Sequence, residues 1–347
     1  MASPEAFPHS FNAVRAQAKL HHAYFLGLQL AVVMEHGAAV TYDWMFRLFR
    51  RQHKDKFLSS FEKLGLTGLP HAVACAQYHV LSNNVGGVGV EYAFESDQKA
   101  WVRFRYPRWM YAGPTICGIP REVSLGFLKG WYAENGVSLK NPRLGFVCVS
   151  EDMTGQFGLC GYFKEFDAPM TKDLRLQFAP DETPPRFADH EQPSVPQDAW
   201  NEARLEKANR NYAVEYVRNG LIELASVVGE QAALAIGCRV ARLIGLQYFA
   251  ETRALIGGGD GGVADASRYL AQMLEGMGDE VRILSAEEGI VHQSNQRILS
   301  GLPQDNARLV WLCWQELWVG AMRSQSVMKS LSVIESDQGI EWRIELT

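Results

Sequence analysis

The sequence predicts an α+β protein with two pseudo-repeated lobes, each made of helices and an antiparallel sheet of two β-hairpins. Residues about 20–166 and about 205–346 follow the same order of elements: long helices, a strand pair, a helix and a closing strand pair. Identity between the two halves is slight, so order and spacing carry the prediction. The alternative is a chain of two unrelated α+β segments.

Helices are expected at the start of the first half. A helix over residues about 22–52 is apolar on several sides, which is typical of a helix buried between other elements. A break from Gly65 to Pro70 separates it from a second helix over His71–Leu81.

Strand pairs follow the helices in both halves. In the first half, strands over 90–94 and 100–104 flank a polar turn, and in the second half strands over 280–284 and 290–293 do the same. A tryptophan-containing helix then leads to the closing hairpin in each half. The helices lie around Trp131 and Trp311–Trp318, and the closing hairpins begin at residues 147 and 332.

These elements divide the chain into four segments: an arm of residues 1–20, a first lobe of 21–167, a linker of 168–200 and a second lobe of 201–347. The linker is rich in proline, which lacks the donor N–H of a regular helix or central strand. A helix-rich segment from Trp200 to Leu255 follows, and six residues from Gly257 to Gly262 form a loop.

Composition limits the possible classes of function. The chain has 347 residues, 47% of them hydrophobic, and a net charge of −5, which gives no general reason to bind nucleic acid or an anionic membrane. The N-terminus does not resemble a signal peptide, and no spanning helix is expected. Six cysteines without a CxxC pair favour reduced thiols in a cytoplasmic protein. Apolar residues on the helices of 202–255 suggest a homodimer.

The first lobe concentrates residue types suited to catalysis. Glu91 or His79 could abstract a proton, and Arg103 or Arg105 could stabilise the developing negative charge. The five catalytic candidates are Glu91, His79, Arg103, Arg105 and Tyr92. The alternatives are cross-strand ion pairs for the arginines, a helix-end position for the histidine and packing on the sheet for the tyrosine.

Aromatic and amide side chains in the same lobe could hold a substrate. Flat indole and phenol rings provide apolar walls, and their N–H and O–H groups orient a ligand. The candidates are Trp101, Tyr106, Trp109, Trp131, Asn83 and Asn84. The alternatives are core positions for the aromatics and a helix C-cap for the asparagines.

A metal site is not expected. Cys148 and Cys160, with Asp152 or a histidine, could ligate zinc, but the absence of paired CxxC or HxxxH motifs favours buried thiols. We therefore expect no cofactor. Cys117, in a loop, is the best candidate for a nucleophile among the six cysteines.

The closing hairpins carry a resemblance. Cys148, Gly155-Gln156 and Cys160 in the first half, with Gly339 in the second, resemble the closing hairpin of 4-vinyl-reductase-type ligand-binding domains. That family includes phenol- and xylene-sensing regulators, and it shares a fold with TRAPP vesicle-tethering subunits. The resemblance implies an enclosed pocket for a phenolic or alkyl-aromatic compound. The chain lacks the GxxxxGK[ST] motif of the regulators, and it is also similar to the L-2-amino-thiazoline-4-carboxylate hydrolase family.

Three functions remain open. The first is a cofactor-independent enzyme of aromatic-compound catabolism that acts on a small aromatic or carboxylated substrate by proton transfer. A lyase of the retro-aldol type is favoured over a hydrolase. The second is a non-enzymatic protein that binds or senses a phenolic or apolar small molecule. The third is an assembly subunit with a vestigial pocket.

Overall fold

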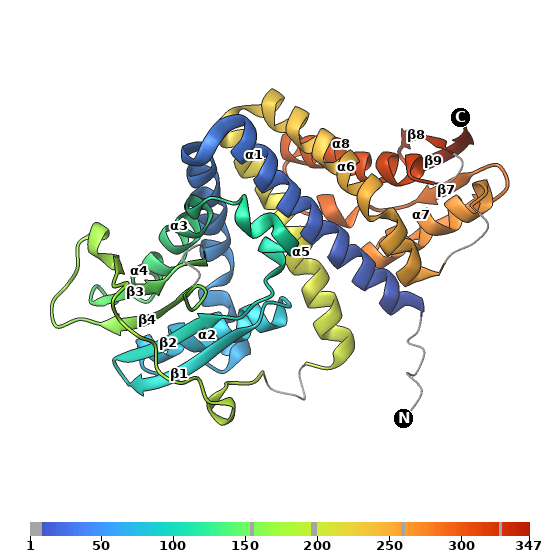
Figure 1. Ribbon diagram of the computed structural model, residues 1–347. Helices are drawn as coiled ribbons and strands as arrows, with labels where there is room; N and C mark the ends of the chain where they lie inside the picture. Colours follow the sequence, from blue (N-terminus) through green and yellow to red (C-terminus); the bar gives the residue numbers. More distant parts are fainter. Residues whose placement is uncertain (1–8, 153–155, 196–199, 258–260, 326–327) are drawn as a thin grey trace. The chain divides into compact units, whose positions relative to one another are not determined.

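The chain folds into two compact units. The computed structural model describes residues 9–152, 156–195, 200–257, 261–325 and 328–347. We call Val32–Leu205 the central unit, and Met1–Ala31 with Glu206–Thr347 the terminal unit. Each unit contains helices and one mainly antiparallel sheet, so the α+β class is confirmed (Figure 1).

The first helix differs from its prediction. Helix α1 runs from His9 to Lys56, with a kink at Gly37, whose φ is 78°. Residues 9–20, predicted as an arm, are therefore helical, and Ala13, Ala16 and Leu20 are buried. No proline or glycine interrupts residues 9–20, and the small buried side chains there allow close packing. The rest of the predicted arm, residues 1–8, lies outside the described residues.

The sheet of the central unit has the strand order β1-β2-β4-β3-β5. Its predicted hairpins are confirmed: β1 (Val90–Ser96) pairs with β2 (Lys99–Phe104), and β3 (Leu144–Ser150) with β4 (Cys160–Glu165), all antiparallel. Helix α2 (His71–Val85) packs on β1, β2 and β4. Two shorter helices, α3 (Arg121–Gly130) and α4 (Asn135–Ser138), lie between the hairpins in sequence.

The predicted linker contributes to this sheet. Strand β5 (Leu176–Phe178) pairs in parallel with β3 at the edge of the sheet, so it is not one of the helices or central strands that the prolines of 168–200 were predicted to exclude. Its three residues include no proline, so the strand can join the sheet at its edge. Phe166, Ala179 and Phe187 pack on the face of the sheet that carries Trp101 and Tyr162.

The terminal unit contains most of the long helices. These are α5 (Glu202–Val228), α6 (Glu230–Ile256), α7 (Val263–Met277) and α8 (Gln304–Arg323). Gly229, with φ at 87°, separates α5 from α6, because a left-handed residue cannot continue a helix.

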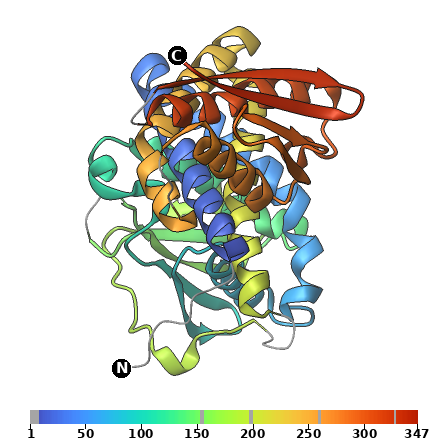
Figure 2. The ribbon, with the colours of Figure 1, turned by 90° about the vertical axis from the view of Figure 1, so that its right-hand side faces the viewer.

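The sheet of the terminal unit also contains two hairpins. Its strands are β6 (Val281–Ser285), β7 (Ile290–Gln293), β8 (Lys329–Ser336) and β9 (Gly339–Leu346). Figure 2 shows the long β8–β9 hairpin in red. The strand order β6-β7-β9-β8 matches the order β1-β2-β4-β3 of the central unit.

Two helices pass the length and hydropathy test for a membrane span, although the sequence suggested none. They cover Phe11–Lys56 and Glu230–Ile256. The test considers length and composition alone, and core helices of folded proteins also pass it. It is weak evidence for membrane insertion.

Gly161 is required where β4 approaches β3. A Cβ atom added at Gly161 would collide with the Val147 carbonyl oxygen and would lie 2.6 Å from Cζ of Phe146. The sheet therefore has no room for a side chain at this position.

We expect Gly161→Ala to lower the free energy of unfolding by about 1–3 kcal/mol, because the added methyl group forces β3 and β4 apart. Urea unfolding measures the effect. Gly89→Ala is the matched control, since a Cβ at Gly89 makes only an ordinary 3.5 Å contact with Arg105. Equal losses in the two variants would contradict the steric explanation.

Candidate functional site

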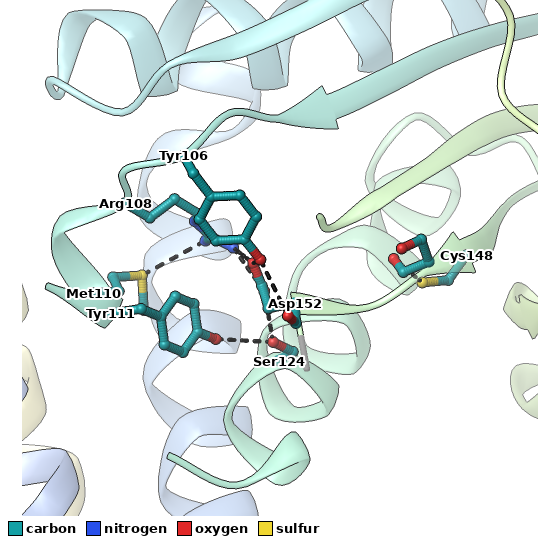
Figure 3. Close-up of polar contacts among 8 residues, drawn as sticks. Tyr106, Arg108, Met110, Tyr111, Ser124, Cys148 and Asp152 are labelled. Atoms are coloured by element: carbon teal, nitrogen blue, oxygen red, sulfur yellow. Dashed lines mark hydrogen bonds and ion pairs between the residues drawn. The ribbon is translucent and has the colours of Figure 1, made fainter. Parts of the chain in front are cut away.

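A buried ion pair lies where the two hairpins of the central unit meet α3. Nη1 of Arg108 donates to both carboxylate oxygens of Asp152, each at 2.7 Å (Figure 3). The side chains are only 4% and 0% exposed. Burial disfavours the charge on Arg108, but the Asp152 carboxylate outweighs burial and raises the pKa of the guanidinium. The guanidinium of Arg108 therefore stays charged inside the fold.

Additional hydrogen bonds satisfy the carboxylate of Asp152. Ser124 on α3 donates to Oδ2 at 2.9 Å, and the Ser124 hydroxyl is also within 2.9 Å of the Tyr111 hydroxyl. The Tyr106 hydroxyl donates to the Asp152 carbonyl oxygen at 3.1 Å and lies 3.4 Å from Oδ1. A buried ion pair is tolerated when its remaining polar groups are bonded in this way.

Aromatic rings hold the guanidinium in position. The Arg108 carbon Cζ lies 4.3 Å from the centroid of the Phe104 ring and 5.2 Å from that of Tyr111. Phe104 is the last residue of β2, and Asp152 follows β3 by two residues. Arg108, in the loop after β2, thus packs on the last residue of that strand and binds Asp152 of the neighbouring hairpin.

A pocket opens beside this ion pair. Its volume is about 490 Å³, and its walls come from the end of β2, the loop that follows and the β3–β4 turn. Tyr106 is 47% exposed and Phe157 is 37% exposed, so aromatic surface faces solvent here. The lining residues include Arg103, Tyr106, Ile116, Asp152, Gln156 and Phe157.

The pocket is adjacent to a surplus of positive charge. Nε and Nη2 of Arg103 contact Oε2 of Glu91 at 2.7 and 2.5 Å, and Arg105 lies 3.8 Å from the other oxygen of Glu91. Two guanidinium groups therefore share one carboxylate. Arg103 also lies 4.6 Å from the ring centroid of Phe187, which fixes it on this face of the sheet.

Glu91 and His79, the two alternative bases of the predicted site, are not brought together. Glu91 pairs with Arg103, and Arg103 pairs with Cys160 on β4. His79 instead stacks on Phe163, with ring centroids 5.4 Å apart. Because Phe163 is three residues beyond Cys160, its side chain lies on the opposite face of the sheet. The sheet thus separates His79 from Glu91, which corrects the expectation that both belong to one site.

His79 has a structural role instead. It is 1% exposed, and Nε2 lies 2.9 Å from the Asn135 amide nitrogen. Burial, with a smaller effect from His53, lowers the pKa of His79 well below its usual value. The ring is therefore neutral and closed off from any substrate.

Several other candidates also support the fold. The backbone N–H of Tyr92 donates to Gln192, and the indole N–H of Trp101 donates to Glu95. Asn84 accepts a hydrogen bond from the Val90 N–H at 2.9 Å, so it fixes the start of β1.

Three further candidates lie away from the pocket lining. The Asn83 amide donates to the His79 carbonyl oxygen, and Trp131 packs edge-on against His53. Trp109 begins a short 3₁₀ helix, next to Arg108. Of the predicted site residues, Arg103 and Tyr106 line the pocket, and Glu91 and Arg105 lie next to them.

The hypothetical zinc ligands have other contacts. Asp152 is bonded to Arg108, and the thiol of Cys148 donates to the Ser150 carbonyl oxygen at 3.3 Å. Burial raises the pKa of Cys160 to about 12. Within the residues that the structure describes, no cluster of three or more His, Cys, Asp or Glu side chains could hold a metal ion.

Sequence reasoning missed Arg108 and Ser124, and it considered Asp152 only as a possible zinc ligand in an alternative that it did not favour. The two charged residues are 44 positions apart, so no local pattern connects them. One signal was available: if β2 pairs with the closing hairpin, the end of β2 must lie near the turn of that hairpin.

No family model, no curated protein and no solved structure matches the chain. Functional conclusions therefore depend on the residues described above.

We expect Asp152→Asn to cost about 3–5 kcal/mol in the free energy of unfolding, because it leaves the Arg108 charge buried without a counter-charge. Arg121→Gln is the matched control: Arg121 pairs with the neighbouring Glu151 at 2.8 Å, but its side chain is 54% exposed. Its loss should be about 1 kcal/mol or less. Urea unfolding measures both variants. Similar losses in the free energy of unfolding would show that burial does not increase the contribution of the Arg108–Asp152 pair.

We expect a pH-dependent effect at His79. Its pKa is lowered in the folded state. The contribution of the neutral His79 ring to the free energy of unfolding is therefore complete above the pKa of histidine in the unfolded chain, about 6.5. It is lost as the pH falls below that value. The destabilisation by His79→Gln should shrink by about 2 kcal/mol between pH 7.5 and about pH 5.

Urea unfolding at the two pH values measures this change. The control is His190→Gln, since the His190 side chain is 83% exposed and its replacement should have little effect. A destabilisation by His79→Gln that stays constant with pH would contradict a buried neutral imidazole.

Proposed function

We propose that the central unit binds a small aromatic compound carrying a carboxylate, in the pocket beside the Arg108–Asp152 pair. The observation that supports this most is the sharing of Glu91 by Arg103 and Arg105. One carboxylate neutralises only one of two guanidinium groups, so the pocket wall favours an anion. Arg103 has five N–H donors, and its contacts with Glu91 involve only Nε and Nη2.

The other walls suit an aromatic ring. Tyr106 and Phe157 are both partly exposed at the pocket. The volume of about 490 Å³ falls in the range of small-molecule sites, roughly 300–1,000 Å³. A ring between these side chains would bury apolar surface on both sides.

Binding is favoured over catalysis because Tyr106 at the pocket and Glu91 beside it are both engaged by other residues. Burial, followed by the charge of Asp152, raises the pKa of Tyr106 to about 12. Glu91 is already paired with Arg103 and Arg105. A proton-transfer enzyme with Glu91 as base remains the second hypothesis, since that carboxylate is next to the pocket wall.

An internal duplication belongs to the same proposal. The shared strand order of the two sheets supports it. In this view the central unit holds the site and the terminal unit supports it. The resemblance to 4-vinyl-reductase-type domains, the homodimer and the cytoplasmic location stay predictions, and the binding proposal depends on none of them.

Calorimetric titration of the full chain with benzoate, 4-hydroxybenzoate and phenol tests the proposal. We expect benzoate and 4-hydroxybenzoate to bind more tightly than phenol, because these two compounds carry a negative charge that can pair with Arg103. Arg103→Gln should weaken benzoate binding by about tenfold or more, since a hydrogen bond to a charged group is worth about 1.5–3 kcal/mol.

Arg143→Gln is the matched control, because Arg143 pairs with Glu165 outside the pocket lining. Equal affinity for phenol and benzoate, or no effect of Arg103→Gln, would refute recognition of an acid. New product signals in NMR spectra, lost in Glu91→Gln, would favour the enzyme hypothesis instead.

A further inference from the structure

Two thiols of the terminal unit lie next to each other. Cys238 is on α6 and Cys313 on α8, and their side chains are hydrogen-bonded to one another. The Cys238 sulfur also lies 3.6 Å from the carbonyl oxygen of Leu312, the residue before Cys313. Both cysteines are reduced.

Glycines allow the two helices to come this close. A Cβ at Gly245 would collide with the Leu317 carbonyl oxygen, and one at Gly320 with the carbonyl oxygen of Arg242. At Gly237, directly before Cys238, a Cβ would collide with the Cys313 sulfur itself. Close backbone contact along α6 and α8 therefore holds the two sulfurs together.

The two thiols have different environments. Cys238 is half-buried, and its hydrogen bond from Cys313 lowers its pKa. Burial and the Glu316 carboxylate oppose this effect, and Arg242 adds a smaller one in the same direction. Cys313 is fully buried, and the interaction with Cys238 and then burial raise its pKa. A partly exposed thiol with a lowered pKa beside a second thiol is typical of redox-sensitive cysteine pairs.

We propose that Cys238 and Cys313 form a redox-active pair that a peroxide converts into a disulfide joining α6 to α8. The Cys238 thiolate attacks hydrogen peroxide and becomes a sulfenic acid, with release of hydroxide. The Cys313 thiol then attacks the Cys238 sulfur, and the hydroxyl group leaves as water. In sum, two thiols and one peroxide give one disulfide and two molecules of water. This site is independent of the pocket in the central unit.

The other cysteines provide controls. Cys148 and Cys160 lie on adjacent strands, where Cys160 pairs with Ser150, but both are buried with raised pKa values and should not react. Cys117 is exposed, so peroxide would oxidise it independently of the Cys238–Cys313 pair. The Cys117→Ser variant removes this competing thiol.

The test treats full-length Cys117→Ser protein with hydrogen peroxide, blocks the remaining thiols with N-ethylmaleimide and maps the peptides by mass spectrometry without reduction. We expect a Cys238–Cys313 cross-link, reversed by dithiothreitol, and no Cys148–Cys160 cross-link. In Cys313→Ser protein, Cys238 should form a sulfenic acid that dimedone traps. In Cys238→Ser protein, Cys313 should stay reduced.

Two results would overturn the proposal. One is peroxide treatment that leaves Cys238 reduced or takes it to the sulfinic acid without a cross-link to Cys313. The other is oxidation of Cys148 and Cys160 at the same rate as Cys238 and Cys313, which would show that the α6–α8 environment confers no reactivity.

Discussion

The buried ion pair of Arg108 and Asp152 is the interaction on which the central unit's site depends. It ties the loop after β2 to the turn of the second hairpin, and Ser124 adds α3 to the same carboxylate. A charge removed from water is stable only if its partners are fixed, so the pair also fixes what surrounds it. Tyr106 is one such group, because its hydroxyl donates to the Asp152 carbonyl oxygen.

Much of the fold could be predicted because its signals are local. The hairpins of the central unit follow from alternating residues on either side of the turn at Glu95–Gln98, and the register Glu91↔Arg103 agrees with the expected facing of these residues. Strand β5 was missed because three residues without a pattern join the sheet only when β3 offers an edge. The start of α1 was missed because proline and polar residues before it suggested an arm, whereas buried alanines extend the helix.

The candidate site could be predicted only in part. Arg103, Arg105 and Glu91 were grouped correctly because strand pairing and alternation determine their common face. His79 was misplaced because sequence does not reveal which face of the sheet α2 covers. Arg108 and Asp152 belong to different hairpins, so only the pairing of β2 with β4 brings them together. The Cys238–Cys313 pair could not be predicted from sequence for the same reason. The two residues are 75 positions apart, and glycines set the distance between α6 and α8.

The engagement of the Tyr106 hydroxyl has a consequence for selectivity. A phenol has a single proton to donate, and Tyr106 gives it to Asp152. Toward a ligand the Tyr106 oxygen can then act only as a hydrogen-bond acceptor. A carboxylate has no proton to donate to it. A guest that carries an alcohol or phenol group as well as an acid would satisfy both walls, with its anion at Arg103 and its hydroxyl proton at Tyr106. Discrimination among aromatic acids would then depend on the ring position of that second group.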